Sequence, residues 1–256
     1  MMYCHMSGAG NDFVVLDARN QNLELQSLAI KLCRKTGADG FLALDHSEIG
    51  DFRLHFYNPD GLRGEMCGNG ARCICRFARE IGLCSDEMTV ETDAGLVYGW
   101  YLGGDKYRVQ LNLPGIMDFQ RAAPAIYGEL GNPGIPHALL EVSEKPEKES
   151  LLDKALTLRH HPAFPKGANV SFFTAPEEGA VYVLTYERGV EDYTLSCGTG
   201  CGSIACALYM QGRLPDKKLL CRNPGGDLNI RICAEGDTVT ALYLEGPATQ
   251  IAVYEM

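Results

Sequence analysis

The chain has 256 residues, of which 46% are hydrophobic and 22% are charged, and its formal net charge is −10. This composition is typical of a globular protein, and the length suits two domains of ordinary size. The acidic balance argues against nucleic acid as a partner and against a basic membrane anchor, because both depend on surfaces rich in lysine and arginine.

The elements expected along the chain are those of a mixed α/β protein. Residues 1–13 lack the basic and apolar stretches of a secretory signal, and no apolar run approaches the roughly 20 residues that span a bilayer, so we expect a cytoplasmic protein without a membrane partner. Apolar periodicity predicts helices at 24–36 (ending before Gly37), 70–81 and 200–212. Alternation predicts strands at 108–113, 180–186 and 239–246. The stretch 114–135, rich in proline and glycine, is interpreted as the crossover between two halves.

Cysteine is unusually frequent, with eleven residues. The odd count and the expected cytoplasmic location argue against a disulfide framework. Structural zinc is the alternative, but no C-x-x-C pair and no histidine cluster of familiar spacing occurs, so we expect no metal. Most of the cysteines are interpreted as small buried apolar side chains: Cys4, Cys33, Cys84, Cys206, Cys221 and Cys233.

The chain contains an internal repeat. Residues 52–75 and 181–206 each begin as an alternating strand, pass a tyrosine and a polar turn, reach Cys-Gly-x-Gly and continue as a helix. Two further pairs of segments match in pattern. The pair 89–99 with 219–232 has nearly the same offset as the main repeat, whereas the pair 10–18 with 168–173 lies farther apart in the sequence.

The repeat predicts two copies of one α/β unit, facing each other with a site made from equivalent loops between them. The N-terminal half is expected at 1–115, completed by a C-terminal strand at about 246–256. The C-terminal half is expected at 116–245.

The motif Cys-Gly-x-Gly at the start of a helix is suited to binding an anion and to activating a thiol. Its glycines let the backbone turn tightly and approach a ligand. The first N–H groups of the helix are unpaired and lie at the positive end of its dipole, so this end binds an anion such as a carboxylate. The same field lowers the pKa of a nearby thiol, which predicts reactive thiols at Cys67 and Cys197. The alternative is a packed cysteine at a strand-to-helix turn, which explains one copy more readily than two.

Two such helix ends across a cleft suit the inversion of a stereocentre. A thiolate on one face of the substrate removes the α-proton, and a thiol on the other face delivers a proton. Backbone N–H groups then stabilise the charge that develops on the carboxylate. The sequence therefore predicts an amino-acid epimerase that uses Cys67 and Cys197.

Four segments resemble the motifs of the diaminopimelate epimerase family of two-cysteine, pyridoxal-phosphate-independent epimerases and racemases: SGAGNDFVVLD (7–17), NPDGLRGEMCGNGARC (58–73), YERGVEDYTLSCGTG (186–200) and PGGDL (224–228). The resemblance covers nearly the whole chain. It implies two pseudo-symmetric α/β domains, each a mostly antiparallel sheet curled around a central helix, with the active site in the interdomain cleft. It also implies interconversion of LL- and meso-diaminopimelate, for lysine and peptidoglycan precursors, without cofactor or metal.

The resemblance assigns a role to each matching residue. Cys67 and Cys197 match the catalytic cysteines, and His137 matches a histidine near the reacting centre. The backbone that grips the α-carboxylate is matched by Gly68, Asn69, Gly198 and Thr199. Substrate-binding positions are matched by Asn11, Asn58, Asn169, Glu187 and Arg188. Arginine can hold a carboxylate through two hydrogen bonds. The alternatives are that Asn11 and Asn58 are turn residues. In the same way, His137 could be a packed loop residue and Arg188 a surface charge.

Several positions depart from the family pattern: Ser7, Leu62, Ile135 and Tyr193. None removes a predicted catalytic group, but Leu62 and Ile135 put the identity of the substrate in doubt. A racemase or epimerase of another amino acid with the same chemistry is therefore the first alternative. A non-catalytic binding protein of the same fold and a thiol redox protein are more remote. The expected partner is a small amino-acid substrate, and a homodimer is left open.

Overall fold

The computed structural model describes residues 1–64 and 67–255. The chain folds as two compact units, one made of residues 1–110 with 245–256 and the other of residues 111–244. The boundary expected after residue 115 would fall inside a strand that begins at Pro114, whereas the division after residue 110 precedes that strand.

The first unit is a mainly antiparallel sheet with two helices. Its helices are α1 (Leu25–Thr36) and α2 (Gly68–Glu80). Its strands are β1 (Met2–Gly8), β2 (Asn11–Asp17), β3 (Gly40–Asp45), β4 (Phe52–Tyr57), β5 (Arg63–Gly64), β6 (Glu87–Thr92), β7 (Gly95–Gly103), β8 (Lys106–Leu111) and β18 (Thr249–Glu255). Two of its strand pairs are parallel, β2 with β3 and β4 with β6.

The second unit has the same plan. Its helices are α3 (Lys148–Arg159) and α4 (Gly198–Met210). Its strands are β9 (Pro114–Ala122), β10 (Ala125–Gly131), β11 (Gly134–Val142), β12 (Asn169–Thr174), β13 (Ala180–Glu187), β14 (Asp192–Thr194), β15 (Lys218–Asn223) and β16 (Gly226–Glu235). It also contains β17 (Thr238–Pro247) up to residue 244, and the last three residues of this strand belong to the first unit. Its parallel pairs are β11 with β12 and β13 with β15.

The order of elements confirms that one fold occurs twice, and it corrects one of the predicted matches. In the first unit α1 connects the parallel strands β2 and β3, and in the second α3 connects the parallel strands β11 and β12. β12 therefore corresponds to β3, and β11 to β2. The expected match of 168–173 with 10–18 is wrong, because apolar patterns alone do not distinguish two neighbouring parallel strands.

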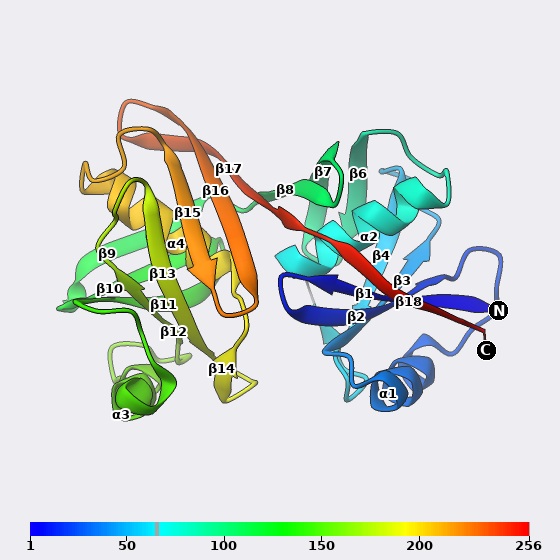
Figure 1. The fold of residues 1–256 in the computed structure, drawn as a ribbon, viewed down its shortest axis with the longest axis horizontal. Helices are drawn as coiled ribbons and strands as arrows, with labels where there is room; N and C mark the ends of the chain where they lie inside the picture. Colours follow the sequence, from blue (N-terminus) through cyan, green and yellow to red (C-terminus); the bar gives the residue numbers. More distant parts are fainter. Residues whose placement is uncertain (65–66, 256) are drawn as a thin grey trace. The chain divides into compact units, whose positions relative to one another are not determined.

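Each unit encloses one helix and carries another on the outside of its sheet (Figure 1). Residues 200–208 of α4 are all buried, and the helix contacts strands from β9–β12 as well as β15 and β16. α2 is enclosed in the same way by β1, β2, β3 and β7. α1 packs on β2 and β3, and α3 packs on β12 and β13. The predicted sheet curled around a central helix is thus found in both units.

Two predictions about local structure were wrong. The stretch 114–135 forms β9, β10 and the start of β11, not a crossover, because its prolines and most of its glycines lie at strand ends and turns. α3 was not predicted, because Leu152 and Leu156 on its exposed side obscure the helical period.

The predicted burial of six cysteines holds for four of them. Cys84 is half-buried and Cys233 is exposed. Cys233 follows the buried Ile232 in β16, and successive side chains of a strand point to opposite faces. None of the described helices is long and apolar enough to cross a membrane.

The enclosed helix α4 should dominate the stability of the second unit. Leu208→Ala removes a fully buried side chain, and we expect the free energy of unfolding to fall by about 2–5 kcal/mol, because a cavity remains. Met210→Ala, at a 48% exposed position of the same helix, serves as the matched control and should change stability by less than about 0.5 kcal/mol. Urea unfolding curves of both variants measure the difference, and equal losses would contradict this account of α4.

Candidate active site

Cys197 lies at the N-terminus of the enclosed helix α4. Its backbone is extended, with φ −128° and ψ 106°, and its Sγ accepts a hydrogen bond from the backbone N–H of Gly200 at 3.4 Å. The hydroxyl of Thr199 lies 3.5 Å from the same sulfur. A side chain at Gly200 would approach Ser171 Oγ to 2.7 Å, so glycine is what lets the first turn of α4 lie against β12. The second glycine of the motif therefore has a packing reason.

The thiol of Cys197 differs from the predicted one in its acidity. Its side chain is buried, with an exposed fraction of 6%. Burial raises the pKa of the Cys197 thiol well above its usual range, and the negative charge of Glu187 adds to this effect. Hydrogen bonds from Thr199 and Gly200 act in the opposite direction but are weaker. Burial and Glu187 thus shift the pKa of the Cys197 thiol in the direction opposite to the one expected from a helix N-terminus.

Strand topology explains why other predicted residues surround Cys197. β12 and β13 are antiparallel, so Asn169 at the start of β12 and Glu187 at the end of β13 lie at the same edge. β14 pairs with the end of β13 and leads directly to Cys197. His137 lies on β11 beside Asn169. These side chains therefore lie at one edge of the sheet, next to the N-terminus of α4.

His137 contacts the helix start directly. Its Nε2 lies 3.0 Å from Thr199 Oγ1, within hydrogen-bond distance. The ring is fully buried, and burial lowers the pKa of His137 to about 3, with a smaller contribution from the nearby positive charge of Arg188. The imidazole is therefore neutral at physiological pH.

Glu187 and Arg188 are oriented by hydrogen bonds within the second unit. Thr194 Oγ1 donates to Glu187 Oε1 at 2.6 Å. The backbone N–H of Arg188 donates to Asn169 Oδ1 at 2.8 Å, and its guanidinium donates to the backbone oxygen of Lys166 at 2.9 Å. The predicted residues of this half thus form one connected cluster: His137, Asn169, Glu187, Arg188, Cys197, Gly198 and Thr199.

Cys67 occupies the equivalent place in the first unit. It precedes α2, with φ −129° and ψ 121°, and its side chain is half-buried. These angles are close to those of Cys197, so the backbone enters the helix in the same way at both cysteines. Gly68 and Asn69 are buried in the first turn of α2. Glu65 and Met66, in the motif that precedes Cys67, lie outside the described residues.

A buried arginine orients the predicted asparagines of this half. Asn69 Nδ2 donates to Asn11 Oδ1 at 2.5 Å, and Arg72 Nη2 donates to Asn69 Oδ1 at 3.0 Å. Arg72 is fully buried, and it also donates to the backbone oxygens of Gly68 and Pro247. Asn11 and Asn69 are therefore held together at the start of α2.

Asn58 is not drawn into this network. It follows β4 in a turn in which its backbone N–H donates to the oxygen of Leu62 and its own oxygen accepts from Gly61. Within residues 1–64 and 67–255 its side chain makes no hydrogen bond to Asn11 or Asn69. The structure thus shows Asn58 as a turn residue, and its role in binding stays a prediction.

The structure adds two residues that sequence analysis missed, Thr194 and Arg72. Each lies within three to seven positions of a predicted residue, and Arg72 follows Asn69 at the three-residue helical spacing that places side chains on one face.

The structure also shows where Tyr193 lies, one of the positions that depart from the family pattern. Tyr193 is buried in the apolar cluster of the second unit and packs edge-on against Tyr186 at 5.3 Å, so it does not reach the cluster around Cys197.

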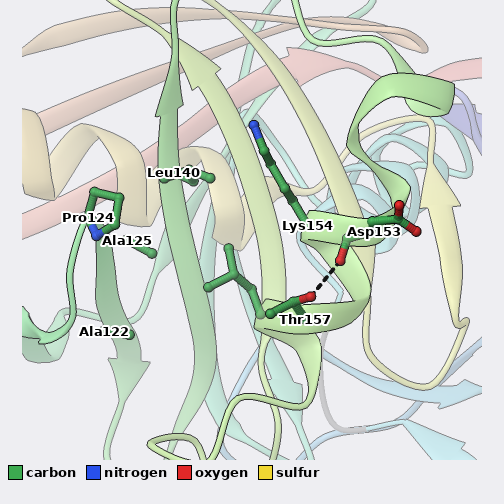
Figure 2. Close-up of a pocket in the computed structure, with 8 residues that line it drawn as sticks. Ala122, Pro124, Ala125, Leu140, Asp153, Lys154 and Thr157 are labelled. Atoms are coloured by element: carbon green, nitrogen blue, oxygen red, sulfur yellow. Dashed lines mark hydrogen bonds between the residues drawn. The ribbon is translucent and has the colours of Figure 1, made fainter.

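Metal ligands and a separate cavity are two further features of the described residues that bear on binding. No group of three or more His, Cys, Asp or Glu side chains in the described part of the chain is placed to hold a metal ion. Figure 2 shows a separate cavity of about 240 Å³ in the second unit, between α3 and the turn that joins β9 to β10. Its walls are mainly apolar, and none of the predicted site residues lines it.

Comparison with known sequences gives a consistent result. The family model described as diaminopimelate epimerase matches residues 3–111 and 130–251. A diaminopimelate epimerase of Aquifex aeolicus is 36% identical over 236 residues, which are 85% of this chain and 84% of that protein. A diaminopimelate epimerase of Chlorobaculum tepidum is 34% identical over 253 residues, which are 96% of this chain and 97% of that protein.

Comparison with solved structures supports the fold. A phenazine biosynthesis protein of Bacillus anthracis superposes with a TM-score of 0.74 at 17% identity, covering 100% of this chain and 98% of that one. A hydroxyproline epimerase of Agrobacterium vitis, solved with trans-4-hydroxy-L-proline, gives 0.71 at 17% identity, covering 99% and 91%.

The buried neutral His137 should make the protein sensitive to acid. In the unfolded chain this histidine takes up a proton below about pH 6.5, whereas in the folded protein its pKa is about 3. The unfolded state therefore binds more protons in this window, and stability is lost as pH falls, by up to about 1.4 kcal/mol per pH unit. Urea unfolding between about pH 7.5 and 5.5 should show a smaller acid loss for His137→Gln than for the wild type. His160→Gln, at an exposed histidine of the same unit, should leave the loss unchanged; identical profiles for all three proteins would refute the assignment.

Proposed function

Because the chain belongs to the diaminopimelate epimerase family of isomerases, we propose that it interconverts LL- and meso-2,6-diaminopimelate by a two-base mechanism with Cys67 and Cys197. The observation that carries this proposal is the cluster around Cys197, in which groups suited to carboxylate and ammonium binding surround a thiol at a helix N-terminus. The matching turn at Cys67 provides the second thiol. The reaction would serve lysine and peptidoglycan precursor synthesis in the cytoplasm.

The mechanism needs one proton acceptor and one proton donor. Cys197 is assigned the donor role in the free enzyme, because its raised pKa keeps its proton on sulfur. Cys67 then removes the α-proton as thiolate, and Cys197 delivers a proton to the opposite face of the same carbon. In the reverse direction the two roles are exchanged. The backbone N–H groups at the starts of α2 and α4 hold the α-carboxylate, where negative charge develops in the transition state.

The remainder of the substrate would bind through side chains. Arg188 suits the second carboxylate, since it presents several donors in a planar group. Glu187 suits an ammonium group, and Thr194 fixes its orientation. Asn11, Asn58 and Asn169 would complete the binding of the polar ends. His137, being neutral and hydrogen-bonded to Thr199, would support the helix start without carrying charge.

The first alternative is epimerisation of another amino acid by the same two cysteines. Two departures from the family pattern favour testing it, namely Leu62, which is 63% exposed, and the half-buried Ile135. Tyr193 gives no such reason, because its side chain is buried in the apolar cluster of the second unit. A binding protein without activity is the remote alternative. A homodimer stays a prediction.

Proton NMR of the reduced protein with LL-diaminopimelate in D₂O tests the function. We expect loss of the α-proton signal together with appearance of the meso isomer, without added cofactor. Exchange with another amino acid, but not with diaminopimelate, would favour the first alternative. Absence of exchange across a panel of amino acids would favour the binding protein.

Serine variants test the roles of the two thiols. Cys67→Ser and Cys197→Ser should each lower kcat by roughly 10²–10⁴-fold, because a serine hydroxyl is a far weaker acid and its anion is inaccessible near neutral pH. Cys84→Ser in the first unit and Cys233→Ser in the second are the matched controls, because both lie outside the predicted site and should keep normal turnover. Full activity in either single catalytic variant would rule out the two-base mechanism.

A further inference from the structure

Arg188 is held by two segments of the second unit that do not belong to the same element. Its guanidinium donates to the backbone oxygen of Lys166, in the loop that leads to β12. Its backbone lies in the turn between β13 and β14 and donates to Asn169. The direction of the guanidinium therefore depends on how this loop and this turn are placed relative to each other.

Arg159, the last residue of α3, contacts both segments. On the side of the turn, its Nε and Nη2 donate to Glu191 Oε1 at 3.2 and 2.6 Å. The same carboxylate oxygen accepts from the backbone N–H of Gly189 at 2.9 Å, and the backbone N–H of Glu191 donates to the oxygen of Glu187. Arg159 is thus hydrogen-bonded, through Glu191, to the turn that carries Glu187 and Arg188.

On the side of the loop, Arg159 fills the space next to Gly167. A Cβ atom at position 167 would lie 1.9 Å from Arg159 Nη1, and the backbone φ of Gly167 is +64°, a conformation that favours glycine. The backbone oxygen of Arg159 also accepts from Ala168 at 3.4 Å. Since Gly167 directly follows Lys166, the guanidinium of Arg159 lies beside the segment whose backbone oxygen binds Arg188.

The ion pair between Arg159 and Glu191 is better suited to orienting the turn at 187–191 than to stabilising the folded protein. The Arg159 side chain is 12% exposed and that of Glu191 is 44% exposed. Pairs of this kind contribute little to folding, because water screens the charges. The hydrogen bond from Arg159, followed by that from Gly189, lowers the pKa of the Glu191 carboxyl, so the pair stays charged at neutral pH.

We propose that Arg159 is a positioning residue for Arg188, and that it holds the guanidinium of Arg188 in the direction needed for the second carboxylate of a dicarboxylate amino acid. The inference rests on the proposed function, since it treats Arg188 as the group that binds this carboxylate. Arg159 itself does not touch the substrate. Its loss should weaken binding of the substrate without removing any group from the chemistry at the α-carbon.

Steady-state kinetics of Arg159→Met with LL-diaminopimelate tests the proposal. Methionine keeps much of the apolar stem but removes all the hydrogen bonds of the guanidinium. We expect KM to rise about tenfold while kcat falls by less than about threefold, because binding shared by ground state and transition state is lost. Arg159→Lys retains the charge and should recover part of the affinity.

Arg213→Met is the matched control. Arg213 lies in the same unit and also donates two hydrogen bonds to a carboxylate, that of Glu141. Among the described residues, the side chain of Arg213 is hydrogen-bonded to Glu141 and Gln211 and not to the turn at 187–191 or the loop at 166–168, so KM should stay at the wild-type value. A rise in KM shared by both variants would indicate a general effect of losing a surface ion pair and would overturn the proposal.

Glu191→Gln provides a second variant if Arg159→Met does not fold, because it changes only the charge of an exposed side chain. It should raise KM by about threefold, with kcat nearly unchanged. Normal KM in a folded Arg159→Met or Glu191→Gln protein, with wild-type turnover of LL-diaminopimelate, would overturn this inference alone. A wild-type protein that does not turn over LL-diaminopimelate would overturn the proposed function and this inference together.

Discussion

The enclosed helix of each unit is the constraint on which the candidate site depends. A helix surrounded by its own sheet must begin inside the protein, where backbone N–H groups at its first turn need acceptors. In α4 the sulfur of Cys197 accepts one of these groups. The fold therefore creates a place for a thiol and an anion before any charged side chain is considered. Glycine at position 200 is part of the same constraint, because it lets the helix start lie against β12.

The second unit shows how secondary structure supplies the remaining groups. Antiparallel pairing places the start of β12 and the end of β13 at one edge, and the chain then returns through β14 to the helix. Residues far apart in the sequence, such as His137 and Thr199, which are 62 positions apart, meet at this edge through a single hydrogen bond. The polar groups are also linked to one another, through Thr194 to Glu187 and Asn169 to Arg188. A change in one of these residues is thus expected to alter the orientation of its neighbour.

Much of this arrangement was accessible from the sequence. The repeated Cys-Gly-x-Gly motif predicted the two helix starts and the doubled fold, because glycine spacing and apolar periodicity are local properties. The effect of burial on the pKa of Cys197 was not foreseen, because burial depends on the whole unit and cannot be read from the motif. The role of Arg72 was missed for a related reason, since an arginine on a helix is expected to face solvent, whereas this one is fully buried. The match of 168–173 with 10–18 failed because strand order depends on pairings between distant residues.

The two helix starts are alike in backbone but different in their surroundings. Five residues after Cys67 stands the buried Arg72, and five residues after Cys197 stands Gly202, packed beside Leu111, Leu130 and Leu242. A symmetric dimer built from one half would carry every substitution in both copies. Joining the two halves in a single polypeptide removes this restriction, so each copy can acquire its own residues. The duplicated chain can therefore evolve an acidic and a basic partner separately, a division of labour that identical subunits related by a twofold axis do not permit.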